Sequence, residues 1–399
     1  MVWKCFFAAS SLTLQKRHAI SFALGSLTMF TAFGLDGVLV VAIPSLLIYL
    51  LQGFIRGHGQ RAVFGWVLMF CWLFCSHLRS ASERGKVNLN GSLMVLVANI
   101  CMLLTDLGEG GKQLEGPGER ADISLLHILG YAFFWPCILA GPCMKMQHYN
   151  AFIAPSAVGN VRAGAKRVVQ AFAAALVHLV LGRICSFSRF EGPFFDEQLP
   201  LWAKMFFVWG VAVAARCKYY FAWGFAEGLL WCLDVNGDGR GLFRQIRISH
   251  VEWASSPRDL ISNWNISISS LWLYEYVYLR GGKSALLTNL VSACWHGFHG
   301  GYYIAFVSIA FAVTTWRKAF RLGLGFGPWL GPVITQFVMN GLLMPFVLLS
   351  ARASLKYLRQ VWLLPHIFVV ALFCVCVGVE RVKRVKRREI AVESKEGDN

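Results

Sequence analysis

A histidine, His296, lies inside a long uncharged stretch of the sequence. No Lys, Arg, Asp or Glu occurs between Ser284 and Trp316, so we expect His296 to lie within a bilayer, where a titratable side chain is costly and usually functional. In apolar surroundings the imidazole is neutral and can take a proton from an alcohol, as a general base does. The competing interpretation is a structural histidine that bonds to a hydroxyl or carbonyl of a neighbouring helix.

The residues next to His296 favour the functional interpretation. Glycines allow a backbone or a ligand to approach closely, and tryptophan and tyrosine provide amphipathic walls. Both kinds are dense here, namely Trp295, Gly297, Gly300, Gly301, Tyr302 and Tyr303. His299 could share the site, or it could only form a local hydrogen bond.

An asparagine upstream could complete the site. Asn265 follows Trp264 in the amphipathic segment Arg258–Arg280. The apolar part of that segment, Ile266–Leu279, is too short to span a bilayer, so we expect an interfacial or re-entrant helix. A hairpin could return Asn265 to His296, where the amide could orient a substrate or the imidazole.

Membrane-spanning helices must position these residues. Hydrophobic residues make up 56% of the chain and charged residues only 15%, whereas soluble domains carry about 25% charged residues. A crossing helix needs about 20 mainly apolar residues, and runs of that kind predict an all-α, polytopic integral membrane protein, a helical bundle with about nine to eleven spans. They are expected near residues 20–34, 36–54, 62–78, 91–107, 124–144, 167–185, 203–233 (one span or two short passes), 285–313, 328–350 and 361–379.

The span expected at 124–144 is interrupted by Pro136, Gly141 and Pro142. Such residues free backbone groups that protein or a water-filled cavity must satisfy. The segment is therefore either a broken helix that lines a cavity or a helix with a simple kink. No internal repeat is visible in the sequence, which disfavours a transporter built from duplicated halves.

The formal charge of +17 comes from loops and from the C-terminal end. No basic groove with stacking aromatic residues appears, so nucleic acid is not an expected partner, and the positive-inside rule explains basic loops. We expect a transmembrane domain over residues 1–380 and a basic, disordered tail over 381–399, in the cytosol beside anionic lipid headgroups. The cations that follow the last span are Arg381, Lys383, Arg384, Lys386, Arg387 and Arg388.

Other polar groups are interpreted as structural. The twelve cysteines mostly lie in apolar runs and form no CxxC pair, so no metal site is predicted. Asp234–Gly239 imitates the start of a calcium-binding loop, but Gln245 stands where that loop needs glutamate, and we interpret it as a turn. Structural roles are expected for His127, His178 and His366. Pairing with Arg216, Lys218 or Arg280 is expected for Glu227 and Glu275.

Four separated segments resemble one enzyme family. They are LNGSLMVLVANICMLLTDLGEG (89–110), GYAFFWPCILAGPCMKMQHYNAF (130–152), RCKYYFAW (216–223) and the pair SNWN…WHGFHGGYY within 262–303. The chain resembles the membrane-bound O-acyltransferases (MBOAT), and more closely their lysophospholipid acyltransferase branch, over roughly residues 90–310. The resemblance implies the MBOAT fold, a helical bundle around a reaction chamber or tunnel, with His296 as catalytic histidine and Asn265 as its partner.

The resemblance also implies a reaction. An acyl-CoA thioester is already activated, so acyl-CoA serves as co-substrate and no cofactor is needed. His296 deprotonates the acceptor hydroxyl, which attacks the thioester carbonyl, and the leaving thiolate takes a proton. Asn265 holds the hydroxyl or stabilises the developing oxyanion. Substrate binding is expected from Trp264, Trp295, Gly297, His299, Tyr302, Tyr303, Arg216, Lys218, Tyr219 and Tyr220. Candidates for a basic mouth that binds CoA phosphates are Lys145, Arg216, Lys218, Arg244, Arg247 and Arg280.

Three hypotheses about function stay open. The leading one is a lysophospholipid acyltransferase of phospholipid remodelling in the endoplasmic reticulum, with acyl-CoA, lysophospholipid and membrane lipids as partners. The second is a relative that acylates another hydroxyl, of a protein serine, a sterol or diacylglycerol. The third is a transporter with His296 as a proton relay, which the Trp-Asn and Trp-His-Gly pairing disfavours. The headgroup, the acyl-chain preference and a homo-oligomer also stay open.

Overall fold

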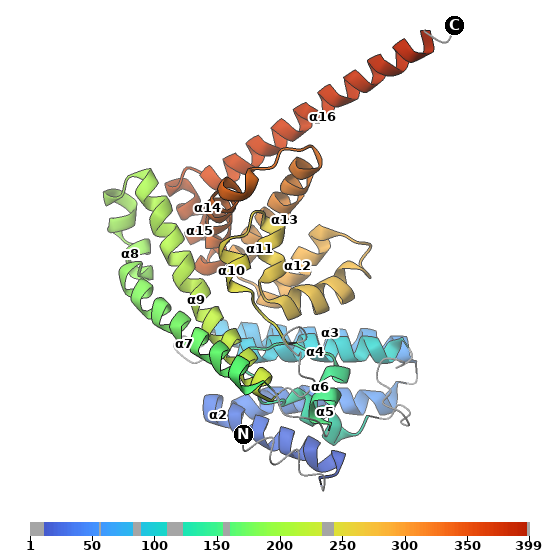
Figure 1. Ribbon diagram of the computed structural model, residues 1–399. Coiled ribbons are helices and arrows are strands. Elements are labelled where there is room, and N and C mark those ends of the chain that lie inside the picture. The colour runs from blue at the N-terminus through green and yellow to red at the C-terminus, as the bar shows by residue number, and fades with distance from the viewer. Residues whose placement is uncertain are drawn as a thin grey trace. The chain divides into compact units, whose positions relative to one another are not determined.

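The described elements of the chain are all helices (Figure 1), and several of them are long and apolar enough to cross a membrane. The computed structural model describes residues 12–55, 57–82, 89–109, 123–154, 160–233 and 243–396, and these contain helices and turns but no strand. The predicted fold class is confirmed, whereas the expected number of spans stays a prediction. Within the described ranges, six helical segments are long and apolar enough to cross a bilayer: Leu14–Phe54, Gly59–Ser80, Asn90–Gly108, Val161–Glu191, Gly327–Leu348 and Leu364–Arg387.

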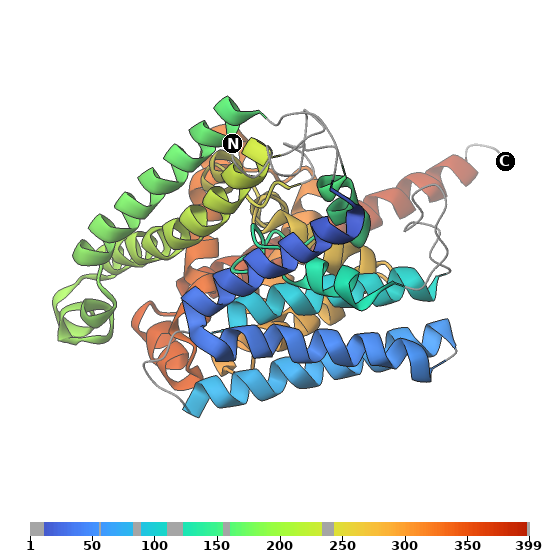
Figure 2. The ribbon, with the colours of Figure 1, turned by 90° about the horizontal axis from the view of Figure 1, so that it is seen from below.

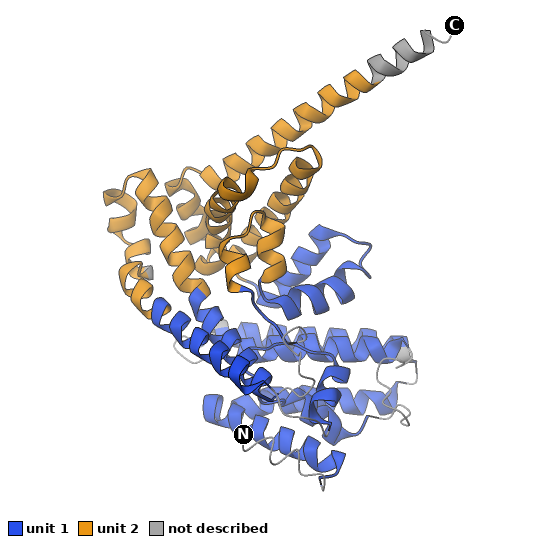
Figure 3. Ribbon diagram, viewed as in Figure 1, with its two compact units in different colours: residues 1–177, 217–247, 264–298 blue, residues 178–216, 248–263, 299–399 orange. Residues whose placement is uncertain are grey.

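The helices form two compact units, which Figure 3 distinguishes by colour. The first unit contains residues 1–177, 217–247 and 264–298, and the second contains residues 178–216, 248–263 and 299–399. Two long helices, α7 (Val161–Ile184) and α9 (Leu201–Leu233), contribute residues to both. Because α9 is one continuous helix of 33 residues, the segment predicted at 203–233 does not form two short passes.

Three helices of the first unit lie side by side, as Figure 2 shows. α2 (Leu14–Phe54) breaks at Gly34, where φ is 68° and ψ is −157°, so the two spans expected there meet at a kink. α3 (His58–Ser82) packs along α4 (Asn90–Gly108), most of whose side chains are buried. These helices contribute part of the apolar core of the first unit, α4 the most among the three.

The span expected at 124–144 is interrupted, and the interruption is a complete break. α5 (Leu125–Ala132) ends early, and turns lead from it to α6 (Met146–Ile153). The physical reason is local, because Pro136 has no backbone N–H to donate and Gly141 has a φ of 89°.

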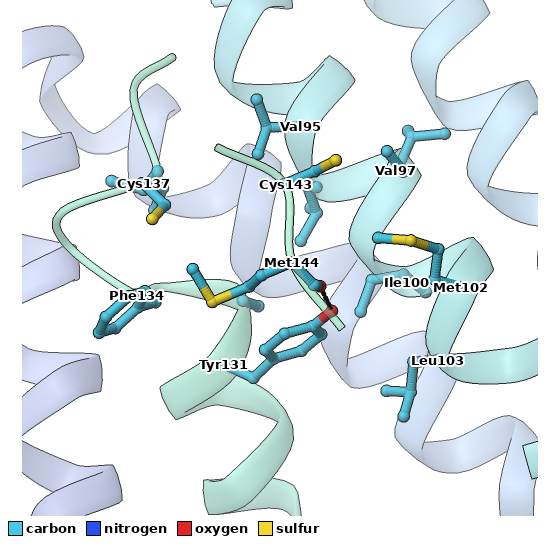
Figure 4. Close-up of a cluster of buried hydrophobic side chains, with 14 of the residues drawn as sticks. Val95, Val97, Ile100, Met102, Leu103, Tyr131, Phe134, Cys137, Cys143 and Met144 are labelled. Atoms are coloured by element: carbon cyan, nitrogen blue, oxygen red, sulfur yellow. Dashed lines mark hydrogen bonds between the residues drawn. The ribbon is translucent and has the colours of Figure 1, made fainter. Parts of the chain in front are cut away.

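Protein groups satisfy the backbone that this break frees. The Tyr131 hydroxyl donates to the carbonyl of Met144 (Figure 4), and the Met144 N–H donates to the side-chain oxygen of Asn99 at 2.9 Å. A small cavity lies beside the break, lined among others by Ser92, Asn99, Tyr131 and Cys137. Of the two interpretations of this segment, the broken helix therefore describes it better than the simple kink.

Two short helices complete the first unit. η2 (Ser267–Tyr278) has wide, π-type turns, and α12 (Ala285–His296) packs against it. At about 1.5 Å per residue, α12 covers about 18 Å, less than the roughly 30 Å of a hydrocarbon core. The span expected at 285–313 is therefore wrong, because the chain breaks at Gly297, with φ 122°, before the next helix begins.

The second unit contains the remaining helices. They are α8 (Phe187–Glu191), η1 (Phe194–Gln198), α10 (Ile248–Glu252), α11 (Pro257–Asn263), α13 (Gly300–Arg321), α14 (Gly327–Leu348), α15 (Ala351–Gln360) and α16 (Leu364–Glu396). α16 continues as a helix over 381–396, in the segment where a disordered tail was expected. This stretch has no glycine or proline and is rich in Glu, Lys and Arg, which propagate an existing helix well.

Candidate active site

His296 is the last residue of α12. Its side chain is half-buried, and its ring centroid lies 5.0 Å from that of Trp295. The N–H of Gly297 donates to the carbonyls of Ala293 and Cys294, both at 3.1 Å. Gly297 has φ 122° and ψ −166°, a region that is essentially restricted to glycine. The glycine after the histidine therefore determines where α12 ends and how His296 is presented.

A second histidine, His77 of α3, lies against this helix end. Its Nε2 is 3.2 Å from the carbonyl oxygen of Trp295, and its Nδ1 is 2.9 Å from the side-chain nitrogen of Asn90. A Cβ added at Gly297 would lie 3.1 Å from Nδ1. Sequence reasoning missed His77, although it occurs in an expected span, which is the same signal that singled out His296.

Asn265 lies just before η2 with a left-handed backbone, φ 45°, which asparagine adopts more easily than other side chains. Its Oδ1 is buried and has no hydrogen-bond partner among the described residues. The ring centroids of Trp272 in η2 and Trp295 in α12 are 5.2 Å apart. Asn265 and His296 therefore belong to packed elements of one unit.

Gln245 holds the two residues that follow Asn265. Its carbonyl accepts from the N–H of Ile266 at 2.7 Å, and its side-chain oxygen accepts from the N–H of Ser267 at 3.0 Å and from the Ser267 hydroxyl. Sequence reasoning considered Gln245 only as a mismatch to a calcium loop. The rest of that loop, Asp234–Gly239, lies outside the described residues.

Glu227 of α9 supports the same segment. Its carboxylate accepts from the backbone N–H groups of Gln245 and Ile246, the latter at 2.8 Å. It also forms an ion pair with Arg167 of α7 at 2.6 Å, and Arg167 donates to the Ile246 carbonyl at 3.0 Å. Both charged side chains are buried. The pairing predicted for Glu227 is therefore wrong, since its partner is none of Arg216, Lys218 and Arg280.

Trp264 packs in an aromatic cluster with α9. Its ring centroid lies 5.7 Å from that of Tyr219, 5.8 Å from Tyr220 and 5.0 Å from Trp223. The segment 216–223 and the Trp264-Asn265 pair are distant in sequence, and they therefore pack together directly before Asn265. The neighbouring Lys218 is exposed, with its Nζ 5.0 Å from the Tyr219 ring centroid.

Arg216 lies in the second unit, where it is buried in an ion pair. Its Nε and one terminal nitrogen donate to the carboxylate of Glu252 at 2.8 and 2.7 Å. The other terminal nitrogen donates to the side-chain oxygen of Asn340. This bidentate pair fixes α9 to α10, and substrate binding by Arg216 stays a prediction.

His299, Tyr302 and Tyr303 also belong to the second unit. His299 precedes α13 and is exposed, and its ring centroid is 5.8 Å from that of Tyr302. A Cβ added at Gly301 would lie 2.1 Å from the carbonyl oxygen of Pro345. The close approach that glycine allows at this position is therefore a contact between α13 and α14.

Like Arg216, two further cations considered for a CoA-binding mouth are paired with acids. Lys145 lies 2.6 Å from Glu275, and Arg280 lies 2.6 Å from Glu109. The carboxylate of Glu275 is thus paired with Lys145 rather than with the cations predicted for it. Burial and the neighbouring charge of Lys145 lower the pKa of His148.

Known proteins resemble the chain over most of its length. Residues 54–351 match the profile of MBOAT, the membrane-bound O-acyltransferase family. Lysophospholipid acyltransferase 6 of Drosophila melanogaster is 25% identical over 410 residues, which are 90% of this chain but 56% of the fly protein. The lysophospholipid acyltransferase of Schizosaccharomyces pombe is 26% identical, with coverage of 89% and 79%. Human membrane-bound glycerophospholipid O-acyltransferase 2 is 25% identical, with coverage of 97% and 83%.

Proposed function

The chain belongs to the membrane-bound O-acyltransferase family and is an acyltransferase, and on that premise we propose that it esterifies the free hydroxyl of a lysophospholipid with an acyl chain from acyl-CoA. The named activities of the fly and yeast relatives support the lysophospholipid as acceptor. The observation that carries the proposal is the placement of His296 at the end of α12, packed against the helix that follows Asn265.

The proposed chemistry needs no covalent intermediate. His296 removes the proton of the acceptor hydroxyl, and the oxygen attacks the carbonyl carbon of the thioester. The carbon–sulfur bond then breaks, and the proton passes to the CoA thiolate. Asn265 contributes an amide whose buried oxygen has no partner among the described residues. That amide is available to hold the acceptor or to donate to the developing oxyanion.

The proposed location is the endoplasmic reticulum, with the C-terminal end in the cytosol. The cations that follow the apolar part of α16 support this orientation, because positively charged segments stay on the cytosolic side. They are Arg381, Lys383, Arg384, Lys386, Arg387 and Arg388. Acyl-CoA would then reach the enzyme from the cytosolic face.

An acyl-transfer assay on membranes that contain the protein tests the proposal. Lysophospholipids that differ in headgroup are each combined with several radiolabelled acyl-CoAs, and the labelled products are separated by chromatography. We expect a diacyl product from at least one lysophospholipid. Product only from a sterol, diacylglycerol or a protein serine would overturn the proposed acceptor, and the absence of any acylated product would favour a transporter.

Two variants test the roles of the site residues. His296→Ala is expected to abolish transfer at normal expression, since a positioned base contributes about 10²–10⁴-fold to the rate. Asn265→Ala is expected to give a large but smaller loss, because it removes positioning and charge stabilisation and leaves the base. Turnover at the wild-type rate in either variant would exclude that residue from the chemistry.

A further inference from the structure

The side chain of His77 contacts the backbone on both sides of His296, at Trp295 and at Gly297. Nε2 of His77 lies 3.2 Å from the carbonyl oxygen of Trp295, and three atoms of its ring would lie between 3.1 and 3.3 Å from a Cβ added at Gly297. The Trp295 carbonyl belongs to the last turn of α12, where carbonyl groups lack a partner within the helix. His77 therefore donates to the Trp295 carbonyl, which has no acceptor role within the helix, and it also packs on Gly297, which ends the helix.

The hydrogen bonds of His77 select one tautomer. A carbonyl oxygen only accepts, so Nε2 must carry the proton that it donates to Trp295. A neutral ring then has a lone pair at Nδ1, which accepts from the amide nitrogen of Asn90 at 2.9 Å. The amide oxygen of Asn90 accepts from the hydroxyls of Ser76 at 2.7 Å and Ser80 at 3.3 Å. In this orientation of the Asn90 amide, its oxygen faces the two serines and its nitrogen faces His77.

With the Asn90 amide in this orientation, the two bonds of His77 fit a neutral ring. An imidazolium would direct a second N–H at the Asn90 amide nitrogen, which also carries hydrogens. A cation next to His296 would oppose the positive charge that a general base acquires when it accepts a proton. The N–H donor of Asn90 therefore favours a neutral His77, and a neutral His77 does not oppose proton uptake by His296.

We propose that His77 is a positioning residue for His296, and that Asn90 holds it in the neutral tautomer with the proton on Nε2. This inference rests on the proposed role of His296 as the base. His77 fixes the Trp295 carbonyl and the Gly297 turn, and so sets the direction in which the imidazole of His296 leaves the helix. It acts through His296 and not on the substrate.

Two variants that differ only in reach test the positioning role. Glutamine at position 77 brings an amide N–H close to the place of Nε2, whereas asparagine reaches only the place of Nδ1. We expect His77→Gln to keep kcat within about threefold of wild type, and His77→Asn to lower kcat about tenfold, the effect of one lost hydrogen bond. KM for both substrates should stay unchanged in both. Equal kcat values in the two variants would overturn the proposal.

His178→Ala is the matched control for His77→Ala. The Nδ1 of His178 donates to the carbonyl of Ala214 at 2.8 Å, which is the same kind of bond from a histidine to a helix carbonyl, in the second unit. Both variants lose one such bond, and only His77→Ala should lose kcat. The chromatographic profile and the unfolding temperature in detergent show whether each variant is folded. Equal loss of kcat in the two alanine variants would assign His77 a structural role only.

Asn90→Asp tests the tautomer. A carboxylate accepts and so requires a proton on Nδ1, which makes His77 a cation while Nε2 still donates to Trp295. We expect kcat to fall about tenfold or more with KM unchanged, and unchanged kcat would overturn the role of Asn90. A wild-type protein that transfers acyl chains and loses transfer in His296→Ala shows that the proposed function holds. Failure of the His77 and Asn90 variants to differ then counts against the present inference alone.

Discussion

The carbonyl oxygen of Gln245 accepts a hydrogen bond from the N–H of Ile266 at 2.7 Å, directly after Asn265. The Gln245 side chain then accepts from the N–H and the hydroxyl of Ser267. One buried residue thus fixes the chain at a point where Asn265 has a φ of 45°. A non-glycine residue keeps such a conformation only where its surroundings determine it strongly, and Gln245 supplies that constraint.

Gln245→Leu is expected to lower both stability and acyl transfer. Leucine has a similar size but leaves the buried N–H of Ser267 without its acceptor, which costs about 1–3 kcal/mol. Turnover per folded molecule should also fall, because Asn265 loses its support. The unfolding temperature and the initial rate, measured at a temperature where the variant is folded, report the two effects separately.

Gln336→Leu is the control for this substitution. Gln336 is also a buried glutamine, and its side chain donates to the carbonyl of Val251 at 2.6 Å. It should cost similar stability without a loss of turnover per folded molecule. If Gln245→Leu had the turnover of Gln336→Leu, Gln245 would have no specific part in positioning Asn265.

The sequence singled out His296 and Asn265 as candidates, but it did not single out the residues that hold the segments around them. The absence of charge around His296 is a local property that can be read directly, and the Trp-Asn pair at Asn265 is a short motif. Gln245 and His77 act through contacts with segments far away in the chain. Such contacts leave no periodicity and no motif, so only the folded structure assigns them.

Arg167→Met is expected to destabilise the protein by about 3–5 kcal/mol, because it leaves the buried carboxylate of Glu227 without its counter-ion. Arg79→Met is the matched control. The ion pair between Arg79 and Asp36 is formed by side chains that are 56% and 55% exposed, and exposed pairs contribute only about 0–1 kcal/mol. Thermal unfolding of both variants in the same detergent measures the difference. Similar losses of stability in the two variants would mean that water solvates the carboxylate of Glu227 when Arg167 is absent.

Gly297→Ala is expected to abolish most of the acyl transfer. Alanine would be strained at φ 122° and ψ −166°, and its Cβ would press on His77, 3.1 Å away. Gly34→Ala separates these two effects, since Gly34 has a similar backbone, φ 68° and ψ −157°, with no atom within 4 Å of an added Cβ. Both variants should lose stability, and only Gly297→Ala should lose turnover. Transfer at the wild-type rate in a folded Gly297→Ala protein would contradict this prediction.

The same two glycines show why helices were easier to predict than their breaks. Hydropathy correctly indicated apolar segments around Gly34 and around Gly297. It cannot report a backbone dihedral angle, so residues 285–313 were predicted as one span although the chain turns after His296. The helix in 381–396 was missed for the opposite reason, because a polar sequence can continue a helix that an apolar segment has already nucleated.

Trp264→Ala is expected to lower turnover strongly, because Trp264 precedes Asn265 and is held by three aromatic rings of α9. Its contacts with Tyr219, Tyr220 and Trp223 are edge-to-face, and such pairs are each worth about 0.5–1.5 kcal/mol beyond buried area.

Trp264→Phe keeps a ring in this cluster and should retain most of the rate. Trp202→Ala is the control, because Trp202 lies on α9 and is 68% exposed. Its loss should change neither stability nor turnover by much. Initial rates with saturating acyl-CoA and lysophospholipid distinguish the three variants. Full turnover in a folded Trp264→Ala protein would mean that the cluster does not position Asn265, and that the bonds from Gln245 are sufficient to hold it.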